Sequence, residues 1–344
     1  MHSPTFQPAN VPALAVLGKW PTCQRPKENL RRAITHDGPE YVPVRRFNGS
    51  IPGLYRIHYR GSRPAVSGET DRWGVRWSAG WPAGAEWEPE IQGYPVEHPL
   101  RDLDALARYP FPDPHDPGLT AGLFDGADQR EVLLAGEVYF PLFDRAHLLT
   151  GMQVLFEAMA ARPDTVRDLF HRVADYQIGV VEQFVRQGVD IVRFAEDYGG
   201  QETLLVSPRM WRSLIKPELA RMFAVAKEAG RLVWLHCCGH IMEIVPDLVE
   251  IGVDILDPLQ ARANDQGEVK RLYGDRLCIL GGMDTQRVLS QGTPDEVGEE
   301  VRRRIALLGP GGGYILGPDT LIPIPEANYR AYLAAGERYG RYPL

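Results

Sequence analysis

Residues 231–260, RLVWLHCCGHIMEIVPDLVEIGVDILDPLQ, contain the pattern that decides the fold. Two apolar runs, RLVWLHCCG at 231–239 and VDILDPLQ at 253–260, predict strands. The segment between them, at 240–252, contains a predicted helix. Two strands that are joined through a helix form a parallel pair. This stretch therefore predicts one repeat of a parallel α/β sheet.

The same alternation extends in both directions from this stretch. Further strands are predicted at 41–47, 131–140, 190–197, 276–284 and 312–319. Helices are predicted at 28–36, 151–160, 163–187, 207–229, 265–273, 293–308 and 325–335; the helix at 207 starts with a Ser N-cap and a Pro. Apolar strands that alternate with helices indicate a sheet covered on both faces. We expect a (β/α)8 TIM barrel, with the eighth strand inside 49–130 or 140–150.

An open, doubly wound sheet is the alternative architecture. It is disfavoured because no Gly-rich dinucleotide loop follows the first strand, and the GGG at 311–313 precedes a strand instead of opening a helix. A chain of 344 residues suits one barrel. We expect residues 1–27 to form an N-terminal tail and residues 28–344 to form a single barrel domain.

Residues 49–130 form an irregular stretch rich in Gly, Pro and Trp, which we interpret as an insertion or lid. Alternation in WGVRWSAGW, at 73–81, predicts a hairpin. Four of the seven tryptophans lie between positions 73 and 87: Trp73, Trp77, Trp81 and Trp87. Such a hairpin either forms a wall of the substrate pocket or plugs the bottom of the barrel.

Composition excludes several classes of protein. The formal net charge of −7 argues against a general binder of nucleic acid or of anionic membranes. No apolar run is long enough for a transmembrane helix, and the N-terminus lacks the pattern of a secretory signal. Four cysteines in a chain of this size are more typical of buried, catalytic or metal-bound thiols than of disulfides. We therefore expect a cytoplasmic protein.

Polar groups follow most of the predicted strands. In a TIM barrel the catalytic residues come from the carboxyl ends of the strands. Each such carboxylate taken alone is as well explained as a helix N-cap or a solvated loop residue, but the set is harder to explain without an active site. The set comprises Glu137, Glu196, Asp197, His236, Cys237, Cys238, Asp257, Gln260, Asp284 and Asp319.

The segment LHCCGH, at 235–240, is the most specific local signal. Side chains alternate along a strand, so His236 and Cys238 point to one side and Cys237 to the other. A His-x-Cys pair is half of a plausible tetrahedral zinc site, or else a buried or catalytic pair. The remaining cysteines and histidines are not expected to be functional. Cys278 is expected in the core, and Cys23 has no defined role. His240 is expected to start a helix, and His98, His147 and His171 are isolated.

Five segments of the chain resemble the uroporphyrinogen decarboxylase superfamily, which includes the cobamide-dependent methyltransferases. They are RPDTVRDL (162–169), EDYGGQETLLVSPRMWRSLIKP (196–217), HCCGHIMEIVPDLVEIGVDILDPLQ (236–260), GGMDTQRVLSQGTPDEV (281–297) and GGGYILGPDTLIPIPEANYRAY (311–332). The resemblance extends from about residue 30 to the C-terminus. It is strongest to the methylcobamide:coenzyme M and O-demethylase-like branch.

The resemblance implies methyl transfer between a small methylated or thiol substrate and a corrinoid carried by a partner protein. In that branch zinc is held by a His-x-Cys pair, which matches His236 and Cys238, and by a Cys near the last strand. This sequence has ILGPDTLIP at the last strand, without a Cys. We therefore expect an oxygen ligand for Zn2+, with Asp319 as the first candidate and Glu137 as the second.

The other strand-end residues receive catalytic and substrate-binding roles. Glu196, Asp197, Asp257 and Asp284 are the catalytic candidates. Substrate binding is expected at Glu137, Gln260, Arg45 and Arg193. Nothing in the chain resembles a corrinoid-binding domain, so the corrinoid must come with the partner.

Decarboxylation without a cofactor, as in the true uroporphyrinogen decarboxylases, is the alternative activity. A carboxylate such as Asp197 or Asp284 would then stabilise a protonated pyrrole, and arginines would bind the acid groups. The segment VPVRRFNGSIPGLYR, at 42–56, lacks the Arg- and Gly-rich signature of that branch. A binding or regulatory protein without catalysis is a third hypothesis, and the cost of burying so many polar groups argues against it.

Overall fold

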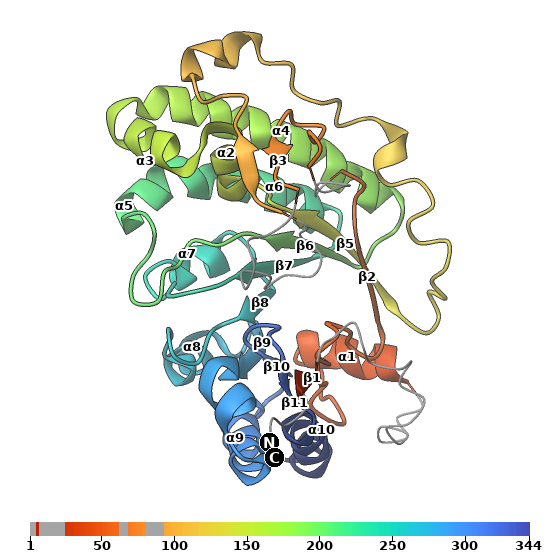
Figure 1. The fold of residues 1–344 in the computed structure, drawn as a ribbon. Coiled ribbons are helices and arrows are strands. Elements are labelled where there is room, and N and C mark those ends of the chain that lie inside the picture. Colours follow the sequence, from red (N-terminus) through yellow and green to blue (C-terminus); the bar gives the residue numbers. More distant parts are fainter. Residues whose placement is uncertain (1–4, 7–24, 62–67, 80–92) are drawn as a thin grey trace.

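The computed structural model describes residues 5–6, 25–61, 68–79 and 93–344. Its centre is a curled sheet of seven parallel strands, ordered β10-β9-β8-β7-β6-β5-β2 (Figure 1). The strands are β2 (Leu54–His58), β5 (Leu133–Tyr139), β6 (Ile191–Ala195), β7 (Leu232–Cys237), β8 (Ile255–Pro258), β9 (Cys278–Met283) and β10 (Tyr314–Pro318). Neighbours in the sheet are also neighbours in the sequence of the strands. That order differs from a doubly wound sheet, in which the strand order reverses at a switch point.

The predicted first strand, 41–47, joins the sheet through one isolated bridge only. Val44 forms an isolated parallel bridge with Leu316 of β10, and Tyr41 forms an antiparallel bridge with Arg341. Pro43 has no N–H to donate, so a regular ladder cannot extend through it. Within the described residues no strand pairing joins this segment to β2. The sheet is therefore curled, and its two edge strands, β10 and β2, are not joined through this segment.

One strand of the sheet, β2, lies within 49–130 at the sheet edge, so the sheet has seven strands, and the described residues do not form the expected closed barrel of eight. Elsewhere the predicted helices are present with small shifts at their ends. They are α1 (Pro26–Ile34), α3 (Met152–Ala161), α4 (Pro163–Arg186), α6 (Lys216–Glu228), α7 (Val245–Glu250), α8 (Gln266–Tyr273), α9 (Pro294–Leu308) and α10 (Glu326–Tyr339). The helix α2 (Phe143–Thr150), directly after β5, was not predicted.

The predicted helix 207–229 is interrupted near its start. Ser207 caps α5 (Pro208–Met210) by accepting a hydrogen bond from the Met210 N–H, as the sequence predicts. A π-helical turn at Trp211–Ile215 then separates α5 from α6. Pro217 explains the interruption, because a proline inside a helix lacks the N–H and its ring collides with the carbonyl four residues earlier.

Two hydrophobic cores lie on the two faces of the sheet. The larger one packs the outer helices against the strands; Figure 1 shows α4 and α6 beside β5–β7, and α9 and α10 beside β9 and β10. The smaller one fills the inside of the curl near the amino ends of the strands. It contains Leu133, Ile191, Trp234, Ile255 and Leu280 together with Leu30 and Ile34 of α1.

Helix α1 closes the amino-terminal end of the curl. Its Leu30 and Ile34 are buried in the inner core. Gly53, immediately before β2, packs so closely on the backbone of Pro26 that a Cβ there would come within 2.5 Å of the Pro26 carbonyl carbon. Function is therefore expected at the opposite, carboxyl-terminal end of the strands.

The Trp-rich segment forms a small antiparallel pair, β3 (Arg76–Trp77) with β4 (Pro95–Glu97). Trp73 is fully buried, with its ring centroid 4.5 Å from that of Tyr176 on α4. The guanidinium of Arg145, on α2, lies 4.7 Å from the Trp73 ring centroid. The pair thus packs beside the helices that follow β5, whereas α1 occupies the amino end. Trp20, Trp81, Trp87 and Cys23 lie outside the described residues.

No helix in the described part of the chain is both long and apolar enough to span a membrane.

Candidate functional site

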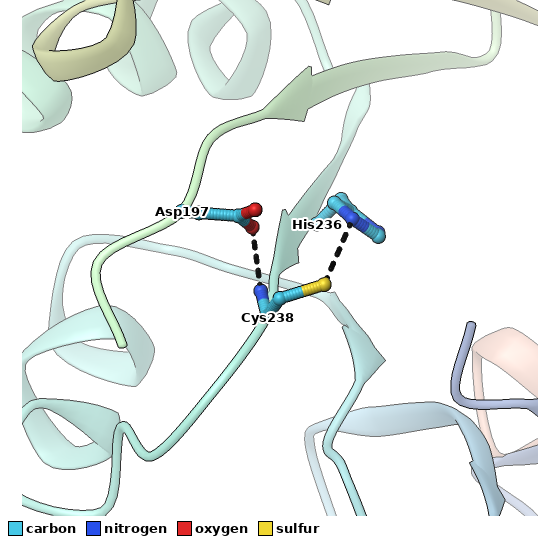
Figure 2. Close-up of side chains that lie close together, drawn as sticks. All are labelled: Asp197, His236 and Cys238. Carbon is cyan, nitrogen blue, oxygen red and sulfur yellow. Dashed lines mark hydrogen bonds between the residues drawn. The ribbon is translucent and has the colours of Figure 1, made fainter. Parts of the chain in front are cut away.

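Three side chains with metal-ligating atoms meet at the carboxyl ends of β6 and β7 (Figure 2). One ligand atom each from Asp197, His236 and Cys238 lies within 4.8 Å of the others. The His236 Nε2 is 3.5 Å from the Cys238 Sγ. The Asp197 Oδ1 accepts a hydrogen bond of 2.7 Å from the Cys238 N–H. We call these three residues the His-Cys-Asp group.

Strand alternation explains how two members of this group reach the same side. His236 lies in β7, and Cys238 follows its last residue. Cys237, between them, is buried and points to the other side, where its Sγ accepts a hydrogen bond of 3.3 Å from the Tyr198 N–H. Burial, together with the nearby charge of Asp197, raises the pKa of the Cys237 thiol well above its ordinary value. Cys237 is therefore a poor thiolate ligand where it lies.

The third member is placed by a close approach of two loops. Gly239 has a φ of +80°, and a Cβ there would lie 2.2 Å from the Gly199 carbonyl oxygen. The loop after β6 and the loop after β7 also share a hydrogen bond of 2.7 Å from the His240 N–H to the Gly200 carbonyl. This contact brings Asp197 against the backbone of Cys238.

Gln260 supports the same loop from the next strand. Its Oε1 accepts a hydrogen bond of 2.7 Å from the Gly239 N–H. Asn264, which the sequence did not single out, accepts from the Ile241 N–H at 2.9 Å and donates to the Gly239 carbonyl at 2.9 Å. Gln260 was predicted to bind substrate, and in the structure its hydrogen bond goes to the backbone beside Cys238.

A chain of buried ion pairs runs below the His-Cys-Asp group. Asp257 accepts from Arg45 (3.0 Å) and Arg193 (3.4 Å), and it lies 3.0 Å from the Nδ1 of His236. Glu137 pairs with Arg193 and with Arg56, the latter at 3.0 Å. These five residues, Arg45, Arg56, Glu137, Arg193 and Asp257, form what we call the ion-pair layer. Three cations and two anions leave one positive charge in excess.

Asp257 carries its charge despite complete burial. Burial alone would raise the pKa of its carboxyl group, but the nearby charges of Arg45, His236 and Arg193 outweigh that effect. The pKa of Asp257 is therefore held below its ordinary range. Asp257 is therefore a carboxylate at neutral pH.

Glu196 lies behind the His-Cys-Asp group and faces α2. Its Oε1 accepts hydrogen bonds from the Leu142 N–H (2.8 Å) and the Asp144 N–H (2.7 Å), and Tyr198 donates to its Oε2. Burial raises the pKa of Glu196 to about 7, against the effect of these donors. Burial and the charge of Glu196 likewise raise the pKa of Asp144. The sequence missed Asp144 because α2 was not recognised as a helix next to the site.

Asp284 and Asp319 lie together at the ends of β9 and β10. The Asp319 Oδ1 accepts a hydrogen bond of 3.0 Å from the Thr285 N–H, and Asp284 caps the turn that follows by accepting from the Arg287 N–H. Burial, with a smaller contribution from the Asp284 charge, raises the pKa of Asp319 to about 6. The grouping thus differs from the expected one: Asp197, and not Asp319 or Glu137, accompanies His236 and Cys238.

Arg56 is the member of the ion-pair layer that the list of candidates omitted. It lies on β2, between Leu54 and His58, in a stretch that sequence patterns left irregular. The Arg56 side chain is 22% exposed, more than either Arg45 (8%) or Arg193 (4%). The segment LYRIH, which forms β2, alternates apolar and polar side chains only over five residues. That alternation is too short to have identified the strand, and with it Arg56, from the sequence.

Comparison with known proteins places the chain among a defined set of relatives. Residues 86–339 match the family described as uroporphyrinogen decarboxylase (URO-D). A methylcobamide:CoM methyltransferase, MtaA, of Methanosarcina barkeri is 26% identical over 180 residues, which is 50% of each chain. A uroporphyrinogen decarboxylase of Aeromonas salmonicida is 23% identical over 239 residues, covering 65% of this chain and 64% of that one.

A methylated-thiol–coenzyme M methyltransferase of Methanosarcina mazei is 28% identical over 151 residues, covering 40% of this chain and 38% of that protein. In sequence, the chain thus spans about half, or less, of the length of these two methyltransferase relatives. Among solved structures, a methyltransferase from Methanosarcina mazei superposes with a TM-score of 0.68 over 92% of this chain and 99% of that one, at 17% identity. At that identity the similarity shows a shared fold.

Proposed function

The chain belongs to the uroporphyrinogen decarboxylase family, and on this premise we propose that it transfers a methyl group between a small methylated or thiol substrate and a corrinoid protein. The observation that carries the proposal is the His-Cys-Asp group at the carboxyl ends of β6 and β7. The names of the two methyltransferase relatives support the same reaction class.

The residues of this group suit a zinc ion. Imidazole nitrogen, thiolate sulfur and carboxylate oxygen are all ordinary ligands of zinc, and three protein ligands leave a position for substrate. We infer that Asp197, His236 and Cys238 hold the ion. A bound zinc ion acts as a Lewis acid and lowers the pKa of a thiol that coordinates it.

Residues around the His-Cys-Asp group are proposed to take part in proton exchange and in substrate binding. We propose Glu196 as a residue that exchanges a proton at neutral pH, because burial raises its pKa to about 7. The ion-pair layer carries one positive charge in excess, and we propose three of its members, Arg45, Arg193 and Glu137, as substrate-binding residues. Asp284, at the end of β9, is proposed as a catalytic residue, whereas Asp319, at the end of β10, accepts a hydrogen bond from the Thr285 N–H.

The methyl transfer balances as a displacement at carbon. The substrate thiol first releases its proton to solvent, and a sulfur lone pair then forms the new S–C bond. The Co–C bond of a methylcob(III)amide breaks at the same time, and both of its electrons stay on cobalt as cob(I)amide. The reverse direction demethylates the substrate. The name of the MtaA relative includes methylcobamide, and we propose that in this case the corrinoid arrives on a separate protein.

The proposal also covers the rest of the architecture. We infer that the segment 41–47 completes a closed (β/α)8 barrel within a single domain spanning 28–344, and that the described parts of 49–130 wall the substrate side. In support, the β3–β4 pair packs through Trp73 on α4 and α2, beyond the carboxyl end of β5. A cytoplasmic location fits an enzyme that keeps a reactive thiol.

Cofactor-free decarboxylation remains the second candidate, and one observation favours it. Arg45, Arg56 and Arg193 converge inside the curl, where arginines could bind the acid groups of a substrate. Against this use, each of the three is already paired with Asp257 or Glu137. The uroporphyrinogen decarboxylase of Aeromonas salmonicida supports the family without deciding between the two reactions.

Zinc content and methyl transfer test the proposal together. The full chain, purified without chelators, should contain zinc, and it should convert methylcobalamin plus a panel of small thiols to cob(I)alamin, followed anaerobically by absorbance. Cys238→Ala should abolish both zinc binding and turnover. Cys237→Ala is the matched control, because its thiol points away, and it should keep both. Absence of zinc, or equal activity in Cys238→Ala, would refute metal-assisted methyl transfer.

A further inference from the structure

Both ring nitrogens of His236 have defined neighbours. The Nδ1 lies 3.0 Å from the Asp257 Oδ2, and the Nε2 lies 3.5 Å from the Cys238 Sγ. A neutral imidazole has one nitrogen that donates and one that accepts. The partner of one nitrogen therefore decides what the other can do.

Asp257 can only accept. It is completely buried, and each of its two oxygens forms an ion pair with an arginine, Oδ1 with Arg45 and Oδ2 with Arg193. A carboxylate without a proton offers no hydrogen to the imidazole. The hydrogen shared between Asp257 and His236 must therefore sit on Nδ1, and the lone pair of the ring is left on Nε2.

We propose that Asp257 is a positioning residue that holds His236 in the Nδ1–H tautomer, with the Nε2 lone pair directed toward Cys238 and Asp197. This inference rests on the proposed zinc site, because the lone pair of Nε2 is the electron pair that a metal ion would accept. A histidine ligand commonly donates its other N–H to a carboxylate, which fixes the ring and increases its basicity.

The position of Asp257 is fixed from both edges of the sheet. Asp257 pairs with His236 in the register of β7 and β8, so their side chains leave the sheet at the same level. Arg45 approaches from the segment that lies beside β10, where its N–H bonds to the Leu316 carbonyl. From the other direction, Arg193 links Asp257 to Glu137 on β5, and through it to Arg56 on β2.

A role in positioning predicts effects that a role in folding does not. Asp257→Asn keeps the shape of the side chain, but its NH2 can donate to Nδ1 and thereby leave the hydrogen on Nε2. Glu137→Gln is the matched control. It removes the same single negative charge from the ion-pair layer, at the carboxylate bonded to Arg193 and Arg56 instead of at the one bonded to His236.

Nitrogen NMR of the histidine rings tests the tautomer directly in zinc-free full-length protein at pH 8. The His236 signals are assigned by their loss in His236→Gln. We expect the Nδ1–H tautomer in the wild type and in Glu137→Gln, and a shift toward the Nε2–H tautomer in Asp257→Asn. Zinc affinity, measured by competition with a chromophoric chelator, should fall roughly 10–100-fold in Asp257→Asn and should be retained in Glu137→Gln.

The outcomes separate this inference from the proposed function. An Nε2–H tautomer in the wild type overturns the inference even if Asp257→Asn does not fold. Equal zinc affinity in Asp257→Asn and the wild type, or an equal loss in both variants, also overturns it. If the wild type binds no zinc, the proposed function fails, and the tautomer of His236 still decides whether Asp257 orients the ring.

Discussion

Asp319→Asn is expected to change how the stability of the protein depends on pH. Asp319 is 4% exposed, and its Oδ1 accepts a hydrogen bond from the Thr285 N–H. Burial raises its pKa from 3.8 to about 6. Asparagine keeps the acceptor oxygen for Thr285 but carries no charge at any pH. The substitution therefore removes the titration and leaves the hydrogen bond.

The sign follows from which state holds the proton more tightly. Between the unfolded pKa of 3.8 and the folded pKa of about 6, the folded protein binds the Asp319 proton and the unfolded chain releases it. The wild type therefore loses stability as pH rises through this window, by about 3 kcal/mol in total at about 1.4 kcal/mol per pKa unit. About 1.4 kcal/mol of that loss falls between pH 5 and pH 7.5. The neutral variant does not share it.

Urea unfolding of zinc-free protein at pH 5 and pH 7.5 measures the effect. The quantity of interest is the unfolding free energy of Asp319→Asn minus that of the wild type. This difference should be more positive at pH 7.5 than at pH 5 by about 1.4 kcal/mol. Effects of the substitution that do not depend on pH cancel in the comparison. A difference that stays constant, or that becomes more negative as pH rises, would show that Asp319 is not a buried carboxyl with a raised pKa.

Three further changes test the site and its support. Asp197→Asn should weaken zinc binding, whereas Asp319→Asn should retain it; the opposite result in a chelator competition would restore Asp319 as the oxygen ligand. Gly239→Ala should destabilise the fold and lower zinc affinity, because its Cβ would collide with the Gly199 carbonyl at 2.2 Å. Gly188→Ala, which also has a positive φ but meets nothing within 4 Å, should cost only about 1 kcal/mol and keep zinc, so similar melting temperatures would contradict the steric argument. Leu30→Ala should lower the unfolding free energy by about 2–5 kcal/mol, because it leaves a cavity in the inner core. Its zinc affinity should not change, and a loss of zinc in the folded variant would show that α1 also shapes the site.

Local patterns in the sequence predicted most of the helices and strands. They also paired two of the three residues of the His-Cys-Asp group, His236 and Cys238. Apolar runs and helical spacing depend on neighbouring residues alone, and six of the seven predicted strands are present as β5–β10. Alternation along β7 also placed His236 and Cys238 on one side, with Cys237 on the other. These features follow from the geometry of a strand, in which successive side chains point to opposite faces.

Tertiary structure decided which strand ends meet. In the sheet β6 lies directly beside β7, whereas β10 lies three strands away from β7, so Asp197 and not Asp319 reaches the pair. The close approach of Gly199 to Gly239 also brings Asp197 against the backbone of Cys238. No local sequence pattern encodes the distance between two loops. The same holds for Arg45 and Arg56, which come from segments with weak strand patterns at opposite edges of the sheet. A sequence states which groups stand at the end of a strand, but the curl of the sheet and the packing of its loops determine which of those groups come within bonding distance.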